Sequence, residues 1–314
     1  MTERTLHWSG EGSLQAFLDS LPMDGVSLTA ALPAGTIREQ VVLARPNTVL
    51  QGATDGETCI TSFCGAKEIL EDGYKRGTFR TATLRTDADH VTLRNLTIVN
   101  EAAPTEEVGQ AIALYAEGDH LLVEDCRLIG AQDTLFTAPL PPKEVEPRGF
   151  IGPKQFAPRT PGRQVYRHCE ITGSIDFIFG GAAAWFEACE LIIRDARRSR
   201  RPEDPCYIAA PSTPEGQRYG YVFHRCSIRS ENVPEGTVYL ARPWREHAKA
   251  WFVDCSADGC LHPQGYAEWS GRIAAGGVDF ADDGLVSDAL RLPGTRRLDS
   301  GEASTLEAFL RESV

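Results

Sequence analysis

The sequence predicts an all-β protein, a right-handed single-stranded parallel β-helix with a short capping helix at each end. Short alternating strands recur along the chain, and a cysteine or an asparagine stands at the bend of each unit. Strands that recur at intervals with insertions between them are typical of a solenoid. The cysteines of this repeat are Cys126, Cys169, Cys189, Cys226 and Cys255, with Asn95 assigned to the same place one unit earlier.

Each unit consists of two short strands separated by a sharp bend. Residues 120–130, 164–173, 184–192, 221–228 and 250–256 follow this order, and residues 90–98 form an earlier copy. A buried cysteine packs like a small apolar residue, so the cysteines are predicted to stack inside the coil. A β-sandwich with cysteines at chance positions is the alternative, and the constant phase of the cysteine in the strand pattern argues against it.

Two amphipathic segments are predicted to cap the open ends of the solenoid. Residues 12–21 form a predicted helix over the first coil, with Ser13 as its N-cap. Near the other end, residues 304–307 form a capping box that opens a helix through Leu310. We expect residues 1–314 to form one catalytic domain, in which 270–314 are a C-terminal tail and capping helix.

Charge and composition exclude several classes of protein. The formal net charge of −12 argues against nucleic-acid binding. The sequence has no long uncharged apolar run, so we expect no membrane span. The N-terminus lacks the pattern of a signal peptide, and nine cysteines without zinc-site spacing fit a reduced, cytoplasmic protein. A secreted chain whose signal had been removed would look the same.

Two segments, residues 132–135 and 176–180, each place one carboxylate among apolar residues. A carboxylate in such surroundings is costly to ionise unless another group compensates. No Ser/His or Cys/His arrangement competes with them, so the sequence predicts hydrolysis with one aspartate as nucleophile and one as proton carrier. Residues 109–114 and 240–244 place Gln110 and Arg242 where successive coils would align them with these aspartates.

Taken together, the four segments resemble the pectin methylesterases (pectinesterases) over about residues 14–269. The resemblance implies that Asp176 is the nucleophile that attacks the methyl ester of a galacturonate carboxyl group. It implies that Asp133 protonates the departing methanol and then acts as a base on water. Gln110 and Gln132 would surround the oxyanion, and Arg242 would pair with the nucleophile and keep it ionised.

The resemblance also implies the partners of the protein. The substrate would be pectin or methylated oligogalacturonides, with Trp244 as a platform for a sugar ring and Phe136, Phe177 and Trp269 as further contacts. No cofactor or metal is expected, and we expect no nucleic-acid or membrane partner and a monomeric protein. Three alternatives remain, which are a thioesterase or other ester hydrolase on the same β-helix, a lyase or glycosidase acting on pectin, and a decayed carbohydrate-binding β-helix.

Two further segments carry hypotheses of their own. Residues 137–163 hold seven prolines and three glycines and make a longer connection than is usual in the family. Long loops are commonly functional, so we expect this one to form a wall of the substrate site and to favour short oligosaccharides. The basic run 194–201 is either a solvated loop or a local attraction for free galacturonate carboxylates.

Overall fold

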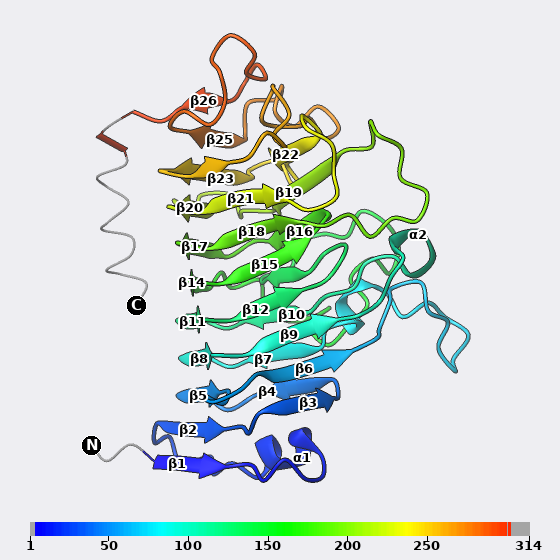
Figure 1. The fold of residues 1–314 in the computed structure, drawn as a ribbon, viewed down its shortest axis with the longest axis vertical. Helices are drawn as coiled ribbons and strands as arrows, with labels where there is room; N and C mark the ends of the chain where they lie inside the picture. Colours follow the sequence, from blue (N-terminus) through cyan, green and yellow to red (C-terminus); the bar gives the residue numbers. More distant parts are fainter. Residues whose placement is uncertain (1–3, 300, 303–314) are drawn as a thin grey trace.

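The computed structural model describes residues 4–299 and 301–302, which wind into a parallel β-helix (Figure 1). Three parallel sheets run along the molecule, and the chain visits them in turn, so that neighbouring strands in a sheet come from successive coils. The predicted fold class is therefore confirmed. None of the helices in the described part of the chain is long and apolar enough to cross a membrane.

The strands of each sheet are given in their spatial order. Sheet A contains β1 (Arg4–His7), β2 (Leu28–Ala31), β5 (Thr48–Gln51), β8 (Val91–Arg94), β11 (Leu121–Glu124), β14 (Arg163–Arg167), β17 (Ala183–Glu187), β20 (Tyr221–His224), β23 (Lys249–Val253), β25 (Asp279–Asp282) and β26 (Arg296–Arg297). Sheet B contains β3 (Gly35–Arg38), β6 (Thr58–Ser62), β9 (Thr97–Asn100), β12 (Arg127–Ile129), β15 (Glu170–Gly173), β18 (Glu190–Ile193), β21 (Ser227–Ser230) and β24 (Ser256–Ala257). Sheet C contains β4 (Val41–Leu43), β7 (Leu84–Asp87), β10 (Leu114–Glu117), β13 (Leu135–Thr137), β16 (Ile175–Gly180), β19 (Cys206–Pro211) and β22 (Val238–Ala241).

Apolar side chains from all three sheets fill the inside of the coil. Leu135 of sheet C belongs to this interior cluster, whereas its neighbour Phe136 belongs to a separate aromatic cluster. Because neighbouring residues of a strand point to opposite faces, the aromatic cluster lies on the outer face of sheet C. It also contains Phe79, Phe150 and Phe179. The outer face of sheet C is thus partly covered by apolar packing.

The predicted cysteine stack is present inside the coil. Each thiol donates to a backbone carbonyl oxygen of the preceding coil, for example Cys169 Sγ to Val123 O at 3.4 Å and Cys226 Sγ to Phe186 O at 3.4 Å. None of the nine cysteines forms a disulfide. The stack therefore consists of small buried side chains, as expected from the repeat.

Asn95 was wrongly assigned to the cysteine position. The backbone N–H of Asn95 donates to Glu124 O, and the N–H of Arg127 donates to Leu96 O, so Leu96 occupies that position. Asn95 instead aligns with Asp125, the bend residue, and both have left-handed backbone angles, with φ of 56° and 53°. Asparagine tolerates this conformation better than most residues, which explains its presence at the bend.

The N-terminal capping helix is present as α1 (Leu14–Asp19). Ser13 is its N-cap, and its Oγ accepts the backbone N–H of Ala16 at 3.1 Å. Leu14 and Leu18 are buried against the first coil. The helix predicted from the capping box at 304–307 lies outside the described residues.

The segment from residue 270 onward contributes β25 and β26 to sheet A, which the sequence analysis did not predict. The fully buried carboxylate of Asp282 holds this last coil together. It binds the Arg291 guanidinium at 2.5 Å and accepts the backbone N–H groups of Gly284 and Val286. These hydrogen bonds offset the cost of burying a polar group.

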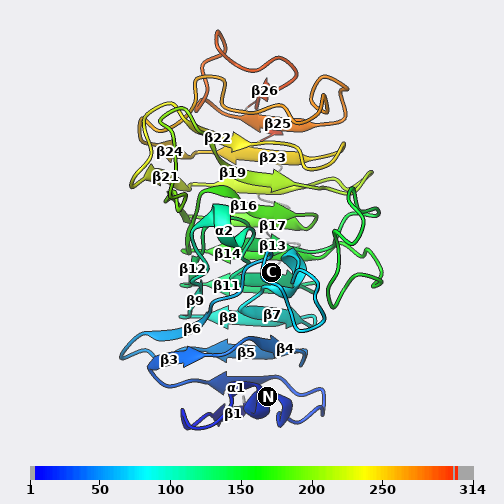
Figure 2. The ribbon, with the colours of Figure 1, turned by 90° about the vertical axis from the view of Figure 1, so that its right-hand side faces the viewer.

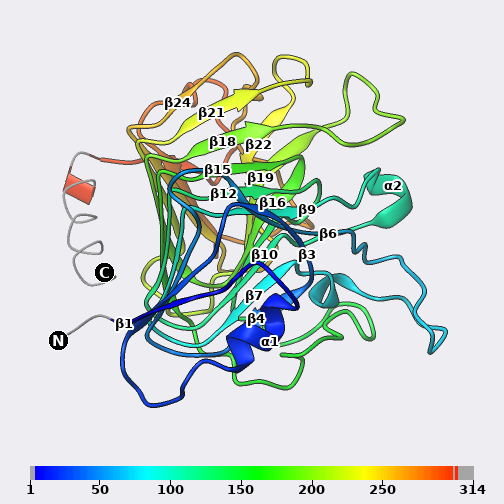
Figure 3. The same ribbon diagram turned by 60° about the horizontal axis from the view of Figure 1, so that its bottom comes forward.

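Two groups of connections flank sheet C. At the corner between sheets B and C, residues 63–77 and α2 (Thr105–Val108) project to the same side, as Figure 3 shows, and η1 (Thr78–Arg80) follows the first of them. At the other edge of sheet C, residues 138–162 connect β13 to β14 and project as a green loop on the right of Figure 2. The strands of sheet C begin beside the first group, and the second group follows the end of β13.

Candidate active site

Four of the predicted polar residues, Gln110, Gln132, Asp133 and Asp176, lie where strands of sheet C begin, whereas Arg242 follows the end of β22 and reaches Asp176 with its side chain. Backbone hydrogen bonds join Ala111 N to Gln132 O at 3.0 Å and Asp133 N to Ile175 O at 3.0 Å. Tyr207 pairs with Ile175 in the same direction. Gln110, Gln132–Asp133, Asp176 and Tyr207 therefore come from successive coils, each at the same place along its coil.

A β-bulge in β16 determines the direction of the Asp176 side chain. The pairing with β19 shifts between Ile175 and Ile178, so β16 contains one extra residue. Phe177 and Ile178 consequently both belong to the interior cluster, although regular alternation would send only one of them inward. Asp176 adopts a left-handed φ of 50° at this point. Bulges of this kind re-aim side chains and are frequent beside active sites.

Arg242 holds the Asp176 carboxylate in a bidentate pair. Its Nε donates to Oδ1 at 2.7 Å, and its Nη2 donates to Oδ2 at 2.5 Å. The guanidinium lies between two aromatic rings, with Cζ at 3.8 Å from the Tyr207 centroid and 4.2 Å from the Trp269 centroid. A planar, permanently charged guanidinium suits both contacts. This arrangement places a permanent positive charge against the Asp176 carboxylate and holds it in one orientation.

The surroundings of Asp133 favour the protonated form of its carboxyl group. Its side chain is buried, and its backbone φ is 63°. Burial raises the pKa of Asp133 well above the ordinary value of 3.8, and the neighbouring Asp176 carboxylate raises it further. Arg242 and a hydrogen bond from the Gln132 side chain act in the other direction on this pKa. The site therefore combines one carboxylate paired with arginine and one carboxyl group that favours its proton.

The two glutamines differ in what surrounds them. Gln132 is half-buried, and its side chain bonds to Asp133. Gln110 is also half-buried and follows Gly109, the C-cap of α2, and its backbone oxygen accepts the N–H of Ala66 at 2.9 Å. The backbone pairing places both glutamines on coils next to those of the aspartates, and the direction of the Gln110 amide towards them stays a prediction.

Two of the predicted sugar contacts need correction. Phe136 and Phe177 have side chains that are 0% exposed, so neither offers surface to a ligand. Phe177 is turned into the interior by the bulge, and Phe136 lies beneath Phe79 and Phe179 in the outer aromatic cluster. Trp244 and Trp269 are only half-buried and pack at the edge of that cluster.

Tyr207 is a site residue that the sequence analysis missed. Its ring covers one face of the Arg242 guanidinium and stacks on Tyr239 with a centroid distance of 5.6 Å. Tyr239 stacks in turn on His262 at 4.3 Å. The position of Tyr207 at the start of β19, one coil after Asp176, was the available signal.

The basic run 194–201 is electrically compensated. Its arginines each have a carboxylate partner, in the pairs Arg194–Glu231, Arg197–Asp195, Arg198–Glu107, Arg200–Asp195 and Arg201–Asp204. The backbone N–H groups of Arg198 and Ser199 also bind Glu106 of α2. This favours a structural role over a free cationic patch, and it ties the segment to the helix that precedes Gln110.

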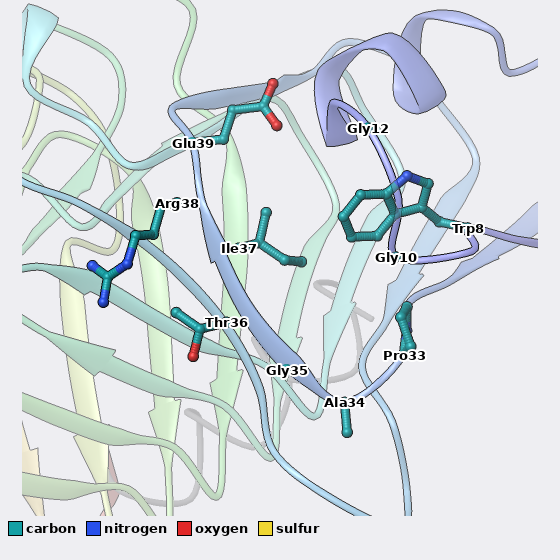
Figure 4. Close-up of a pocket in the computed structure, with 10 residues that line it drawn as sticks. All are labelled: Trp8, Gly10, Gly12, Pro33, Ala34, Gly35, Thr36, Ile37, Arg38 and Glu39. Atoms are coloured by element: carbon teal, nitrogen blue, oxygen red, sulfur yellow. The ribbon is translucent and has the colours of Figure 1, made fainter.

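A separate surface pocket lies near the N-terminal end of the coil. Trp8, Ile37 and Glu39 line it, as Figure 4 shows. The Glu39 carboxylate binds the start of α1, since it accepts the backbone N–H of Leu14 at 2.8 Å. Within residues 4–299 and 301–302, no group of three or more His, Cys, Asp and Glu side chains could hold a metal ion.

Comparison with protein families finds one match over most of the chain. The family model described as Pectinesterase matches residues 22–140 and 159–283. Residues 141–158, which form most of the loop between β13 and β14, lie outside the match.

Curated relatives with this family name are similar over most of the chain. The Arabidopsis thaliana protein "Probable pectinesterase/pectinesterase inhibitor 20" is 32% identical over 256 residues, which cover 79% of this chain and 40% of that protein. "Pectinesterase 2" of Citrus sinensis is 28% identical over 257 residues, or 80% of this chain and 44% of that one. The chain thus spans less than half the length of these two relatives.

Solved structures share the fold. The carrot pectin methylesterase matches with a TM-score of 0.74 and 22% identity over 96% of this chain and 89% of its own. The Yersinia enterocolitica enzyme matches with a TM-score of 0.73 and 23% identity, covering 94% and 96%. A pectin methylesterase in complex with hexasaccharide VII matches with a TM-score of 0.73 and 22% identity over 97% and 95%.

Proposed function

The chain belongs to the pectinesterase family, and we propose that it is a carboxylic ester hydrolase that removes methyl esters from galacturonate units of pectin or pectic oligosaccharides. The observation that carries this proposal is the unequal pair of carboxyl groups. Asp176 is held by the Arg242 guanidinium, whereas burial raises the pKa of Asp133. One group is thus suited to attack and the other to donate a proton.

In the first half of the reaction, a carboxylate oxygen of Asp176 attacks the ester carbonyl carbon. The carbonyl π electrons move to oxygen and form a tetrahedral oxyanion. When this intermediate collapses, the bond to the methoxy oxygen breaks, and the Asp133 proton passes to that oxygen. Methanol leaves, and the galacturonyl carbon is joined to Asp176 as an anhydride.

In the second half, Asp133 is a carboxylate and removes a proton from water. The water oxygen attacks the galacturonyl carbon, and the bond to the Asp176 oxygen breaks. The products are the galacturonyl carboxylic acid, ionised Asp176 and protonated Asp133, and the released acid gives its remaining proton to the solvent. The enzyme therefore returns to its starting protonation state without any other reactant.

Gln110 and Gln132 are the proposed donors to the oxyanion. Their side-chain amides carry N–H groups that do not titrate, so they can donate throughout the pH range. A donor aimed at such an oxygen typically contributes about 10²–10³ in rate. The hydrogen bond from Gln132 to Asp133 lowers the pKa of that carboxyl group, so Gln132 also affects proton transfer.

The test is methanol release from methylated pectin and from methylated oligogalacturonides. We expect methanol without new reducing ends and without unsaturated products, which would indicate a glycosidase and a lyase respectively. Asp176→Asn should reduce the rate by at least about 10⁴-fold, because it removes the nucleophile. The matched control is Asp125→Asn, an exposed carboxylate at a bend outside the site.

The result that contradicts the proposal is equally specific. Near-normal methanol release by Asp176→Asn would show that this residue is not the nucleophile. Turnover of acyl thioesters in place of methyl esters would support a thioesterase, and binding of oligosaccharide without any turnover would indicate a decayed site.

A further inference from the structure

Two long connections lead from sheet B into sheet C on either side of the proposed catalytic pair. One contains α2 and Gln110 and leads into β10, and the other, residues 194–205, leads into β19, which contains Tyr207. The connections between them are short, residues 130–134 before β13 and residue 174 before β16. The two proposed catalytic aspartates stand within the first short connection and at the start of the strand after the second.

The two long connections bind each other. The Glu106 carboxylate of α2 accepts the backbone N–H groups of Arg198 at 3.2 Å and Ser199 at 3.1 Å. The Arg198 guanidinium also binds the Glu107 carboxylate at 2.6 Å. We call these four residues the clasp, which lies on the right-hand side of Figure 1. Since β13 and β16 lie between β10 and β19 in sheet C, the clasp joins the two coils that border the catalytic pair.

One side of the clasp, residues 194–205, has a firmly held base. The Asp195 side chain is 1% exposed and binds the guanidinium groups of Arg197 at 2.5 Å and Arg200 at 2.6 Å. The Asn232 side chain, from the next coil, binds both the backbone N–H and the backbone oxygen of Asp195, at 2.7 Å and 2.9 Å. A buried carboxylate with this many partners is costly to disrupt, so this connection is held in one conformation.

The other side of the clasp leads to Gln110, which stands two residues after the end of α2. Backbone bonds from Ala66 to Gln110 and from Lys67 to Val108, each 2.9 Å long, hold this segment against the preceding coil. The helix itself has only four residues. A single turn is not stable on its own, so the place of α2 depends on these backbone bonds and on the clasp.

The 138–162 loop acts on a different part of the molecule. Its Phe150 ring packs edge to face on Trp244 at 6.4 Å, and its Arg148 guanidinium lies over the Tyr74 ring with Cζ 3.9 Å from the centroid. These contacts reach the aromatic cluster on the outer face of sheet C and the segment before β7. The clasp instead reaches the connections from which the strands of sheet C begin.

We propose that the clasp positions Gln110 for its part in the reaction, with Glu106 as a positioning residue that acts through α2. The carboxylate ties the helix to the firmly held 194–205 connection, so the segment that follows the helix has a fixed course. A hydrogen-bond donor aimed at an oxyanion loses much of its effect when it is displaced by a small distance. This inference rests on the proposed function and adds a positioning residue to it.

The experiment is a double-mutant cycle in the full chain, with methanol release from methylated pectin as the measurement. Gln110→Ala should lower kcat by about 10²–10³-fold, as expected for the loss of an oxyanion donor. Glu106→Ala should lower kcat by roughly tenfold with little change in KM, because the donor is displaced while the substrate contacts remain. In the double variant, Glu106→Ala should cost no more than about twofold beyond Gln110→Ala, because its effect passes through that amide.

Ser199→Pro tests the clasp from its other side, since it removes one backbone N–H donor and leaves α2 unchanged in sequence. It should show the same pattern with Gln110→Ala. Glu203→Ala is the matched control, an exposed side chain of the same connection that pairs with Arg201, and should leave kcat unchanged. Full additivity in the cycle would overturn the inference, because a general loss of structure would add to the loss of the amide. A wild-type kcat in Glu106→Ala or in Gln110→Ala would overturn it as well.

Backbone hydrogen exchange gives a second readout that does not depend on turnover. The N–H of Ala111 follows Gln110 and binds Gln132 O at 3.0 Å. Glu106→Ala should speed the exchange of this amide by about fivefold or more, because α2 is less firmly held. Unchanged exchange in Glu106→Ala would overturn the inference whatever the activity of the protein. Absence of methanol release from the wild-type protein would instead overturn the proposed function, and the catalytic role of the clasp with it.

Discussion

The Arg242 guanidinium binds the Asp176 carboxylate through two parallel hydrogen bonds, Nε to Oδ1 at 2.7 Å and Nη2 to Oδ2 at 2.5 Å. The same guanidinium is enclosed by the rings of Tyr207 and Trp269. Arg242 therefore fixes the orientation of the proposed nucleophile and places a permanent positive charge beside it. Paired donors of this geometry are specific to arginine, since lysine is a point charge.

Arg242→Lys should therefore retain the positive charge and lose most of the activity. We expect methanol release to fall by roughly 10²-fold, because the carboxylate is no longer held in one orientation. Initial rates at saturating substrate measure the effect. Arg245→Lys, on a neighbouring arginine that packs on Trp244, is the comparison and should have a much smaller effect. Equal rates for Arg242→Lys and wild type would contradict the positioning role.

The pKa of Asp133 predicts how stability depends on pH. The carboxyl group titrates near 3.8 in the unfolded chain and at a raised pKa in the folded protein. Between these two values the folded protein retains the proton while the unfolded chain releases it. The stability from this group is therefore complete below 3.8 and is lost as pH rises through the folded pKa.

Asp133→Asn removes this titration. The Tm of the variant relative to wild type should increase as pH is raised from 4 to 8, and methanol release should fall sharply at every pH. Thermal melts at several pH values measure the first effect. Asp125→Asn is the control and should show no such trend. A Tm difference between Asp133→Asn and wild type that is independent of pH would contradict the raised pKa.

Because Phe136 is fully buried, its substitution should lower the stability of the fold and leave the affinity for substrate unchanged. Phe136→Leu should cost about 1–2 kcal/mol, because it leaves a small cavity between Phe79 and Phe179. Its KM should stay near the wild-type value. Trp269→Ala should instead raise KM, since this ring is half-buried and contacts Arg242. Denaturant unfolding and initial-rate kinetics separate the two, and a raised KM for Phe136→Leu at unchanged stability would restore it as a substrate contact.

Hydrogen bonds from the backbone of residues 194–201 to Glu106 of α2 are expected to hold this segment in place and to slow its proteolysis. The Glu106 carboxylate accepts the backbone N–H groups of Ser199 and Arg198, and the bond from Ser199 is the main reason for its lowered pKa. Glu106→Gln should weaken these bonds and speed trypsin cleavage after Arg198 or Arg200. Mass spectrometry of timed digests measures the rates. Glu203→Gln, an exposed change two residues beyond this segment, should leave them unchanged.

The candidate site was predictable to the extent that it depends on local pattern. Asp133 and Asp176 stand out because each is a single charge in an apolar segment, and the repeat places them on successive coils. The direction of Phe177 was not predictable, since the bulge in β16 appears only in its pairing with β19. Tyr207 was missed for a similar reason, because nothing in its own strand indicates that it covers Arg242.

The basic run illustrates the same limit. Residues 194–201 look like a cationic patch in the sequence, yet several of their partners come from other coils. Glu107 binds Arg198, and Glu231 binds Arg194. Whether these arginines are paired therefore depended on which carboxylates of other coils lie close to them in the folded chain.

The sequence by itself determined the β-helix, the cysteine stack, the N-terminal cap and the placement of Gln132, Asp133 and Asp176 on successive coils. These follow from patterns that repeat within a single coil, where alternation and bends act over a few residues. Only the tertiary structure decided which aromatic residues are buried, how Arg242 is enclosed, and that the 138–162 loop meets residues 74–79. Such contacts join residues far apart in the chain, and they depend on strand register and on how long loops fold back over the coil.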